Sequence, residues 1–302
     1  MSDIAVAPAI ATLPREAHPG RIALAAARPR QWTKNLLLFA GLVFAQRFDE
    51  LPSWLAAAAA FAAFCAISSA SYLVNDVRDA ASDALHPVKR LRPVASGELA
   101  PRRALALACL CGIAGFAIAL PLGLRTLLML AAFACLQAAY SLGLKRIAIV
   151  DVTAIAGLFV LRAATGATAV GVGISPWLLA CTALLALFLG LAKRRAELAL
   201  VADGQTPGRA ALRRYSLRVV DRLVVAVAIT TLAVYCVYAL AGPTPAMTAT
   251  VPFVASGLAR YVLLVRGRSL GEMPEEILLT DRGILASIAG FALTGGIVLV
   301  AT

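Results

Sequence analysis

The chain has 302 residues, of which 61% are hydrophobic and 15% are charged, and its mean hydropathy is +0.85. Soluble domains are less apolar and more highly charged, so the composition excludes an ordinary soluble domain and indicates a polytopic membrane protein. The net charge of +12 is explained by basic inner loops and by attraction to anionic membrane lipids, so no nucleic-acid partner is expected.

The apolar stretches predict nine transmembrane helices, because a membrane span needs about 20 predominantly apolar residues. Residues 36–45 are the shortest stretch and reach that length only by including residues 28–35 or by lying tilted. Residues 1–27 contain no continuous apolar core, so we expect a flexible cytosolic tail there and a single nine-helix domain over residues 28–302. The predicted spans are residues 36–45, 55–74, 104–120, 126–144, 149–170, 176–192, 223–241, 247–265 and 284–301.

The basic residues predict the orientation, because short cytoplasmic loops are enriched in lysine and arginine. With the N-terminus in the cytoplasm, only Arg47 and Arg125 fall in outer segments. The inner loops 75–103 and 193–222 are long and charged, whereas the outer loops are short. We therefore expect a multi-pass protein of the inner (plasma) membrane with its active site facing the cytoplasm.

Three aspartates follow the second apolar stretch directly. Asp76, Asp79 and Asp83 are spaced i, i+3, i+7, so they share one face if a helix continues past Val74. Like charges at this spacing repel by roughly 0.2–0.5 kcal/mol per pair, which favours a divalent cation among them. Mg²⁺ fits, because it is usually shared between one or two carboxylates and the phosphates of a substrate.

The aspartates belong to a longer motif. Residues 75–97 contain N-D-x-x-D-x-x-x-D followed by Lys89, Arg92, Pro93 and Gly97. This pattern resembles the first aspartate-rich motif, and the K-x-x-R-P-x-x-x-G element after it, of the UbiA superfamily of membrane prenyltransferases. The resemblance extends from about residue 28 to the last helix. It implies an all-α integral membrane fold with nine transmembrane helices around a central cavity open to lipid.

A departing pyrophosphate requires metal ions and basic side chains around its oxygens, which explains why such residues are grouped. The alternative is an acidic helix end beside a solvated basic loop. The resemblance implies Asp76, Asp79 and Asp83 as catalytic residues, Asn75, Asp76, Asp79 and Asp83 as Mg²⁺ ligands, and Lys89, Arg90 and Arg92 as phosphate ligands.

Residues 28–35 read R-P-R-Q-W-T-K-N. They are similar to the R-P-x-Q-W-x-K-N signature of the superfamily branch that contains the decaprenyl-phosphate phosphoribosyltransferases. This similarity implies substrate contacts for Gln31, Lys34 and Asn35. An interfacial anchor is the alternative interpretation, since tryptophan and lysine are common at bilayer surfaces.

The loop after the sixth predicted helix contains K-R-R-A-E-L at residues 193–198, similar to a K-R-x-E-L element of the same branch. Aromatic prenyltransferases of the superfamily generally carry a second DxxxD motif here, whereas Val201 stands four residues after Glu197 in this chain. Consecutive cations suit a phosphate-rich substrate such as phosphoribosyl diphosphate, and a positive-inside stop is the alternative. The implied substrate-binding residues are Lys193, Arg194, Arg195 and Glu197.

Three further residues complete the expected site. Tyr140 and Lys145 resemble a superfamily element near the diphosphate, although an aromatic-belt residue and a topology anchor would have the same appearance. Arg162 lies near the middle of the fifth predicted helix, where inserting a charge costs about 2.5–3.5 kcal/mol. We expect it to bind substrate, and a structural arginine bonded to carbonyl groups is the alternative.

These observations predict a Mg²⁺-dependent enzyme that transfers the 5-phosphoribosyl group from phosphoribosyl diphosphate to a decaprenyl-like polyprenyl phosphate. The first alternative is a prenyltransferase that joins a polyprenyl diphosphate to an aromatic or other small acceptor. A transporter or channel is the second. It would be expected to contain several charges near the bilayer midplane, whereas Arg162 is nearly alone there.

Overall fold

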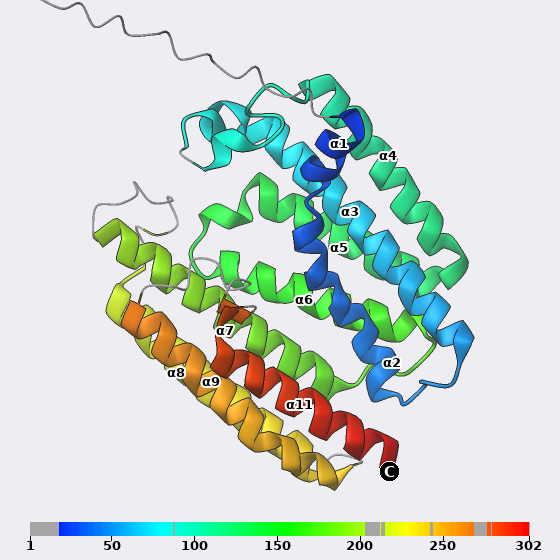
Figure 1. The fold of residues 1–302 in the computed structure, drawn as a ribbon, viewed down its shortest axis with the longest axis vertical. Helices are drawn as coiled ribbons and strands as arrows, with labels where there is room; N and C mark the ends of the chain where they lie inside the picture. The colour runs from blue at the N-terminus through cyan, green and yellow to red at the C-terminus, as the bar shows by residue number, and fades with distance from the viewer. Residues whose placement is uncertain are drawn as a thin grey trace, which may run out of the picture.

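The computed structural model describes residues 18–86, 88–202, 212, 215–241, 244–268, 277–278 and 280–301, and these residues contain helices and no strand. The predicted tail residues 1–17 lie outside this described part. So do residues 203–211, 213 and 214 of the second charged inner loop. Figure 1 shows that the helices pack together into one bundle.

Eight helices in the described residues are long and apolar enough to cross a membrane, which makes the chain a multi-pass, all-α membrane protein. These eight helices are α3 (Leu51–Ala84), α4 (Pro101–Ala119), α5 (Leu124–Leu142), α6 (Val150–Ala169), α7 (Pro176–Ala202), α8 (Leu217–Ala241), α9 (Val251–Arg268) and α11 (Arg282–Ala301). A 3₁₀ helix, η6 (Pro245–Thr250), directly precedes α9.

The first predicted span has a different structure. It consists of a 3₁₀ helix, η1 (Pro29–Phe39), followed by the short helix α2 (Ala40–Phe44). Polar side chains in the first half of η1 bind neighbouring helices and leave too short an apolar stretch for a span. The ninth span is therefore not confirmed. Ahead of η1, α1 (Pro19–Ala27) occupies part of the predicted tail, and its Ala26 is buried.

The η1–α2 segment packs directly against the backbone of α6. A methyl group added at Gly166 would lie 2.1 Å from the carbonyl oxygen of Leu38, and one at Gly41 would lie 2.8 Å from the backbone of Ala167. Small residues allow this close approach, as at many helix interfaces in membranes. In Figure 1 the blue η1–α2 segment passes beside α3 and α6.

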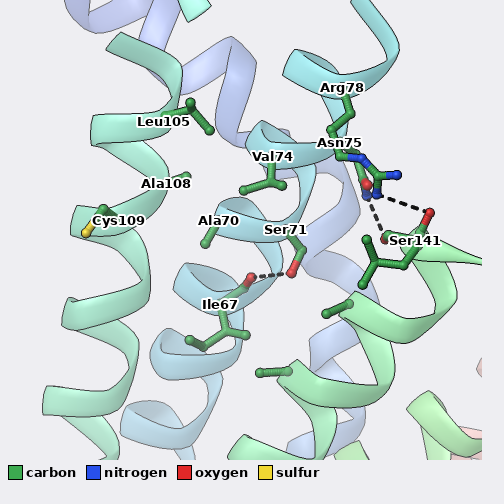
Figure 2. A pocket seen from close by; sticks show the side chains of 13 residues that line it. Ile67, Ala70, Ser71, Val74, Asn75, Arg78, Leu105, Ala108, Cys109 and Ser141 are labelled. Carbon is green, nitrogen blue, oxygen red and sulfur yellow. Dashed lines mark hydrogen bonds between the residues drawn. The ribbon is translucent and has the colours of Figure 1, made fainter. Parts of the chain in front are cut away.

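Helix α6 packs against both α5 and α7 and thereby joins two parts of the bundle. One buried cluster, containing Phe64 and Phe133, lies between η1, α3, α5 and α6. Another, containing Phe188 and Tyr261, joins α6 to α7, α8, α9 and α11. One pocket among the described residues lies between α3, α4 and α5 (Figure 2). A lipid-open cavity in the centre of the bundle stays a prediction.

Helix α3 carries the predicted site out of the apolar region. Its 34 residues correspond to about 51 Å, compared with about 30 Å for the hydrocarbon core of a bilayer. The predicted continuation of the helix past Val74 is confirmed, and the three aspartates lie in its last turns.

Candidate active site

The end of α3 and the loop that follows it form a cluster of opposite charges. Asp76 and Asp83 are 2% and 3% exposed. Arg92 joins them: its Nη1 lies 3.3 Å from Asp76 Oδ1 and also bonds to Asp83 Oδ2. Lys89 Nζ lies 4.0 Å from Asp83 Oδ1. Four residues that the motif predicted are thus brought together, while Arg90 of the same loop is exposed.

Arg28 is a further member of the cluster that was not among the predicted site residues. It follows α1 in a left-handed conformation (φ 56°, ψ 63°), and its Nη2 bonds to Asp76 Oδ1. Its guanidinium lies over the ring of Tyr72, 5.1 Å from the centroid. Burial lowers the pKa of Arg28, and the Asp76 carboxylate partly offsets this effect. Arg28 opens the R-P-R-Q-W segment, but its proximity to Asp76 depends on the kink between α1 and η1.

Asn75 contacts the end of α5, and Asp79 contacts the turn that follows α5. Lys145 Nζ lies 3.5 Å from Asp79 Oδ2, and both side chains are partly exposed. Asn75 Nδ2 donates a hydrogen bond to Ser141 Oγ at 3.0 Å. The acidic end of α3 therefore has two sets of partners, and Ser141 is a contact that no sequence motif identified.

The carboxylate oxygens of this site suit a Mg²⁺ ion that also binds substrate phosphates. In the part of the chain that the structure describes, they do not form a complete metal site from protein ligands alone. Asp76 Oδ2 is buried and has no hydrogen-bond partner among the described residues. Within the same residues, no three His, Cys, Asp or Glu side chains form a group that could hold a metal ion. Magnesium usually takes one or two carboxylates together with substrate phosphates, and Asp76 offers an oxygen for this purpose.

Contrary to the expectation from their spacing, the three aspartates do not need a metal ion to offset their mutual repulsion. Arginine and lysine side chains already compensate the three carboxylates: Arg28 and Arg92 at Asp76, Arg92 and Lys89 at Asp83, and Lys145 at Asp79. Repulsion between the aspartates therefore does not by itself require a metal.

The predicted substrate-binding residues of η1 lie against α3 and α6. Lys34 Nζ donates to Gln31 Oε1 at 2.6 Å, and Trp32 Nε1 donates to Ser69 Oγ at 3.1 Å. Asn35 is completely buried, and its Nδ2 donates to Cys65 Sγ at 3.3 Å. The bonds of Trp32 and Asn35 attach η1 to α3, whereas the Lys34–Gln31 bond lies within η1.

Arg162 is 5% exposed and is bonded to Asn35, so two predicted site residues meet in the interior. Its Nε donates to Asn35 Oδ1 at 2.8 Å, and its Nη1 donates to the carbonyl oxygen of Leu158 at 3.1 Å. The guanidinium also lies over the rings of Phe133 and Phe159, with centroids at 4.7 and 5.1 Å. These uncharged groups take the place of water around the buried guanidinium.

The basic residues at the end of α7 bind other helices. Arg194 is 2% exposed; its Nε lies 2.6 Å from Asp151 Oδ2, and its Nη1 bonds to Glu197. Arg195 Nε lies 3.0 Å from Asp221 Oδ1, and its Nη1 donates to the carbonyl oxygen of Val265. The two arginines thus connect α7 with α6, α8 and α9.

Lys193 and Tyr140 are half-buried in the same region. The start of α6 contacts a residue that sequence reasoning missed. Tyr215 donates a hydrogen bond to Asp151 Oδ1 at 2.8 Å and accepts one from the backbone N–H of Ile149 at 2.6 Å. Burial raises the pKa of Tyr215 to about 12, so its hydroxyl stays a donor at neutral pH. Ile149 has a φ of 70°, which is strained for a β-branched residue.

Known proteins resemble this chain in sequence and in fold. A decaprenyl-phosphate phosphoribosyltransferase of Mycolicibacterium smegmatis is 33% identical over 275 residues, which cover 85% of this chain and 86% of that protein. The protein of the same name from Mycobacterium tuberculosis is 33% identical over 283 residues, covering 90% and 93%.

The fold is similar to that of a UbiA homolog from Archaeoglobus fulgidus bound to GPP and Mg²⁺. The TM-score is 0.72 at 17% sequence identity, over 93% of this chain and all of the other. Residues 35–275 match the sequence model of the UbiA prenyltransferase family. With this match and the two mycobacterial relatives, the chain belongs to the UbiA prenyltransferase family.

Proposed function

We propose that the chain transfers the 5-phosphoribosyl group from phosphoribosyl diphosphate to a decaprenyl-like polyprenyl phosphate, releasing pyrophosphate, with Mg²⁺ as cofactor. The names of the two mycobacterial relatives support this choice of substrates. The observation that carries the proposal is the charged cluster at the end of α3, where Arg28 and Arg92 meet the buried Asp76 and Asp83.

The reaction needs little acid–base chemistry. An oxygen of the lipid phosphate attacks C1 of the ribose while the bond from C1 to the pyrophosphate oxygen breaks, and the bonding electrons leave with the pyrophosphate. Because the acceptor phosphate is already anionic, no general base is required. Asp76 and Asp79 would be the principal Mg²⁺ ligands, supported by Asn75 and Asp83. When bound, Mg²⁺ would neutralise charge on the leaving group.

The basic residues position the diphosphate. Asp76 and Asp83 bind the guanidinium group of Arg92, and Asp76 also binds that of Arg28. Both guanidinium groups are therefore ordered before substrate binds. A guanidinium can form two parallel hydrogen bonds to a phosphate, which fixes the direction of the leaving group. Lys89 and Lys145 add positive charge, and the carboxylates favour a ribose carbon that becomes cationic.

We assign the enzyme to the plasma membrane, with this site on the cytoplasmic side. Phosphoribosyl diphosphate is a soluble, highly charged molecule and would arrive from the cytosol, whereas the polyprenyl phosphate would enter from the lipid. Most basic residues of the chain fall in the segments assigned to the cytoplasm, which supports this orientation.

The test uses the full chain purified into lipid nanodiscs, with Mg²⁺, polyprenyl phosphate and phosphoribosyl diphosphate labelled in the ribose. We expect the label to move into the organic phase with release of one pyrophosphate per transfer, and EDTA to abolish the transfer. Failure of the label to move, while labelled polyprenyl diphosphate is consumed with an aromatic acceptor, would establish the prenyltransferase alternative. Binding without turnover of either donor would point to a transporter.

A further inference from the structure

A groove runs along the side of α3 between α4 and α5. Its volume is about 510 Å³. Its apolar part is lined by residues of all three helices, among them Ile67 of α3, Ala108 of α4 and Ala138 of α5. Asn75, Arg78 and Ser141 lie together at one end, as Figure 2 shows. We call it the α3–α5 groove. A long apolar wall with one polar, cationic end matches the chemistry of a lipid with an anionic headgroup.

The length of the groove corresponds to one leaflet of a bilayer. From Ile67 to Arg78, α3 advances by eleven residues, or about 16 Å along the helix axis. Half of the hydrocarbon core of a bilayer is about 15 Å thick. An acyl chain that fills the apolar part would therefore place its headgroup at the level of Arg78.

The polar end carries uncompensated positive charge. Arg78 is exposed, and its Nη1 donates a long hydrogen bond of 3.5 Å to the carbonyl oxygen of Ser141. It forms no ion pair with a carboxylate in the described part of the chain. On α4, Arg102 is also exposed and stands three residues before Leu105, which lines the groove. Residues three apart share a helix face, so a second cation lies on the groove side.

The groove adjoins the candidate active site at Asn75, which lines its polar end, but it lies on another face of α3 from Asp76 and Asp83. Asp76 and Arg78 are two residues apart, and side chains at that spacing do not face each other on a helix. Asp76 is directed to Arg28 and Arg92, whereas Arg78 is directed to α5. A molecule in the groove therefore contacts the side of α3 that faces away from the buried aspartates.

We propose that the α3–α5 groove binds an anionic phospholipid of the bilayer, with one acyl chain along the apolar wall and the phosphate at Arg78. A soluble phosphate would leave the apolar wall unused. A zwitterionic lipid would gain less from the two arginines, because juxtamembrane basic residues attract net negative charge. The site does not depend on the transfer reaction proposed above.

The test measures lipid retained by the purified chain after detergent extraction from vesicles of phosphatidylglycerol and phosphatidylcholine, using native mass spectrometry. We expect the wild type to retain phosphatidylglycerol preferentially. Arg78→Gln should reduce that preference about fivefold, equivalent to about 1 kcal/mol for one basic residue at a charged membrane surface. Ala138→Phe should abolish retention, because Ala138 lines the groove and is exposed.

Matched controls address the charge and the bulk of these changes. Arg218→Gln removes an exposed arginine at the start of α8, and Leu128→Phe enlarges an exposed residue of α5 outside the groove lining. Both should retain lipid like the wild type. A thermal unfolding scan of each variant identifies any that misfold, and Arg78→Gln alone then decides the test.

Equal retention of both lipids, or unchanged retention in Arg78→Gln and Ala138→Phe, would overturn the proposal. Displacement of phosphatidylglycerol by an equimolar amount of polyprenyl phosphate would also overturn it, because the groove would then belong to the acceptor substrate.

Discussion

Asp76 is the most buried of the three aspartates of the motif. It is buried, it binds two arginines through one oxygen, and its other oxygen has no partner among the described residues. Burial of a charge is expensive unless partners compensate it. Two arginines and one open oxygen are what a carboxylate needs in order to stay charged and still bind a metal.

We therefore expect Asp76→Asn to reduce the initial rate of phosphoribosyl transfer at least about 100-fold, a typical effect of removing one group that stabilises charge in a transition state. The amide keeps the size and the acceptor oxygen but loses the negative charge. Ser82→Ala, at an exposed position of the same helix, is the control and should retain wild-type activity. A rate above one tenth of wild type with unchanged Mg²⁺ dependence would contradict the role of Asp76.

Asn35 and Arg162 provide a test of structure against substrate binding. Because Asn35 accepts a hydrogen bond from Arg162 inside the bundle, Asn35→Ala should lower the free energy of unfolding by about 1–2 kcal/mol. Thermal unfolding measures this loss, and the KM for each substrate measures any contact with ligand. A large increase in KM with unchanged thermal stability would show instead that the pair acts on substrate.

At this scale the sequence predicted residues that share a motif and missed partners that are distant along the chain. The motif pointed to Asp76, Asp83 and Arg92, which the structure brings together. Ser141 could not be predicted, because its hydrogen bond to Asn75 depends on how α5 packs against α3. Likewise, the basic run at the end of α7 gave no sign that Asp151 of α6 would hold Arg194.

At the level of helices, apolar length predicted the spans well where a stretch was long. It was ambiguous for the first stretch, since η1 combines an apolar half with polar side chains that bind α3 and α6. Hydrogen bonds between helices, rather than apolar length, determine the structure there. Composition does not contain that information.

The close contact of η1 with α6 gives a sharp expectation for Gly166. A methyl group at this position would lie 2.1 Å from the carbonyl oxygen of Leu38, so Gly166→Ala should displace η1 and lower the thermal unfolding temperature. Gly112→Ala is the matched control, because its added methyl group meets nothing within 4 Å inside α4.

The control should be neutral or slightly stabilising, since alanine favours a helix by up to about 1 kcal/mol over glycine. Equal unfolding temperatures for the two variants would mean that the backbone contact between η1 and α6 is not maintained in the membrane.

For the whole molecule, the decisive question is the side of the membrane on which the charged cluster lies. Helices α4, α5 and α6 separate the end of α3 from the α6–α7 turn, so three crossings place Ser82 and Gly173 on opposite sides. The distribution of arginine and lysine predicts that Ser82 lies on the cytoplasmic side. Ser82 is exposed, and a side chain at Gly173 would meet no atom within 4 Å, so both positions tolerate a cysteine.

In a variant whose six native cysteines are replaced, we expect a membrane-impermeant maleimide to label Gly173→Cys in intact cells. Ser82→Cys should react only after the cells are permeabilised. The reverse pattern would place the aspartates outside the cell, where phosphoribosyl diphosphate from the cytosol could not reach them, and the proposed reaction would then lose its donor. Because the two cysteines must report opposite sides, labelling of both in intact cells would instead contradict the three crossings by α4, α5 and α6.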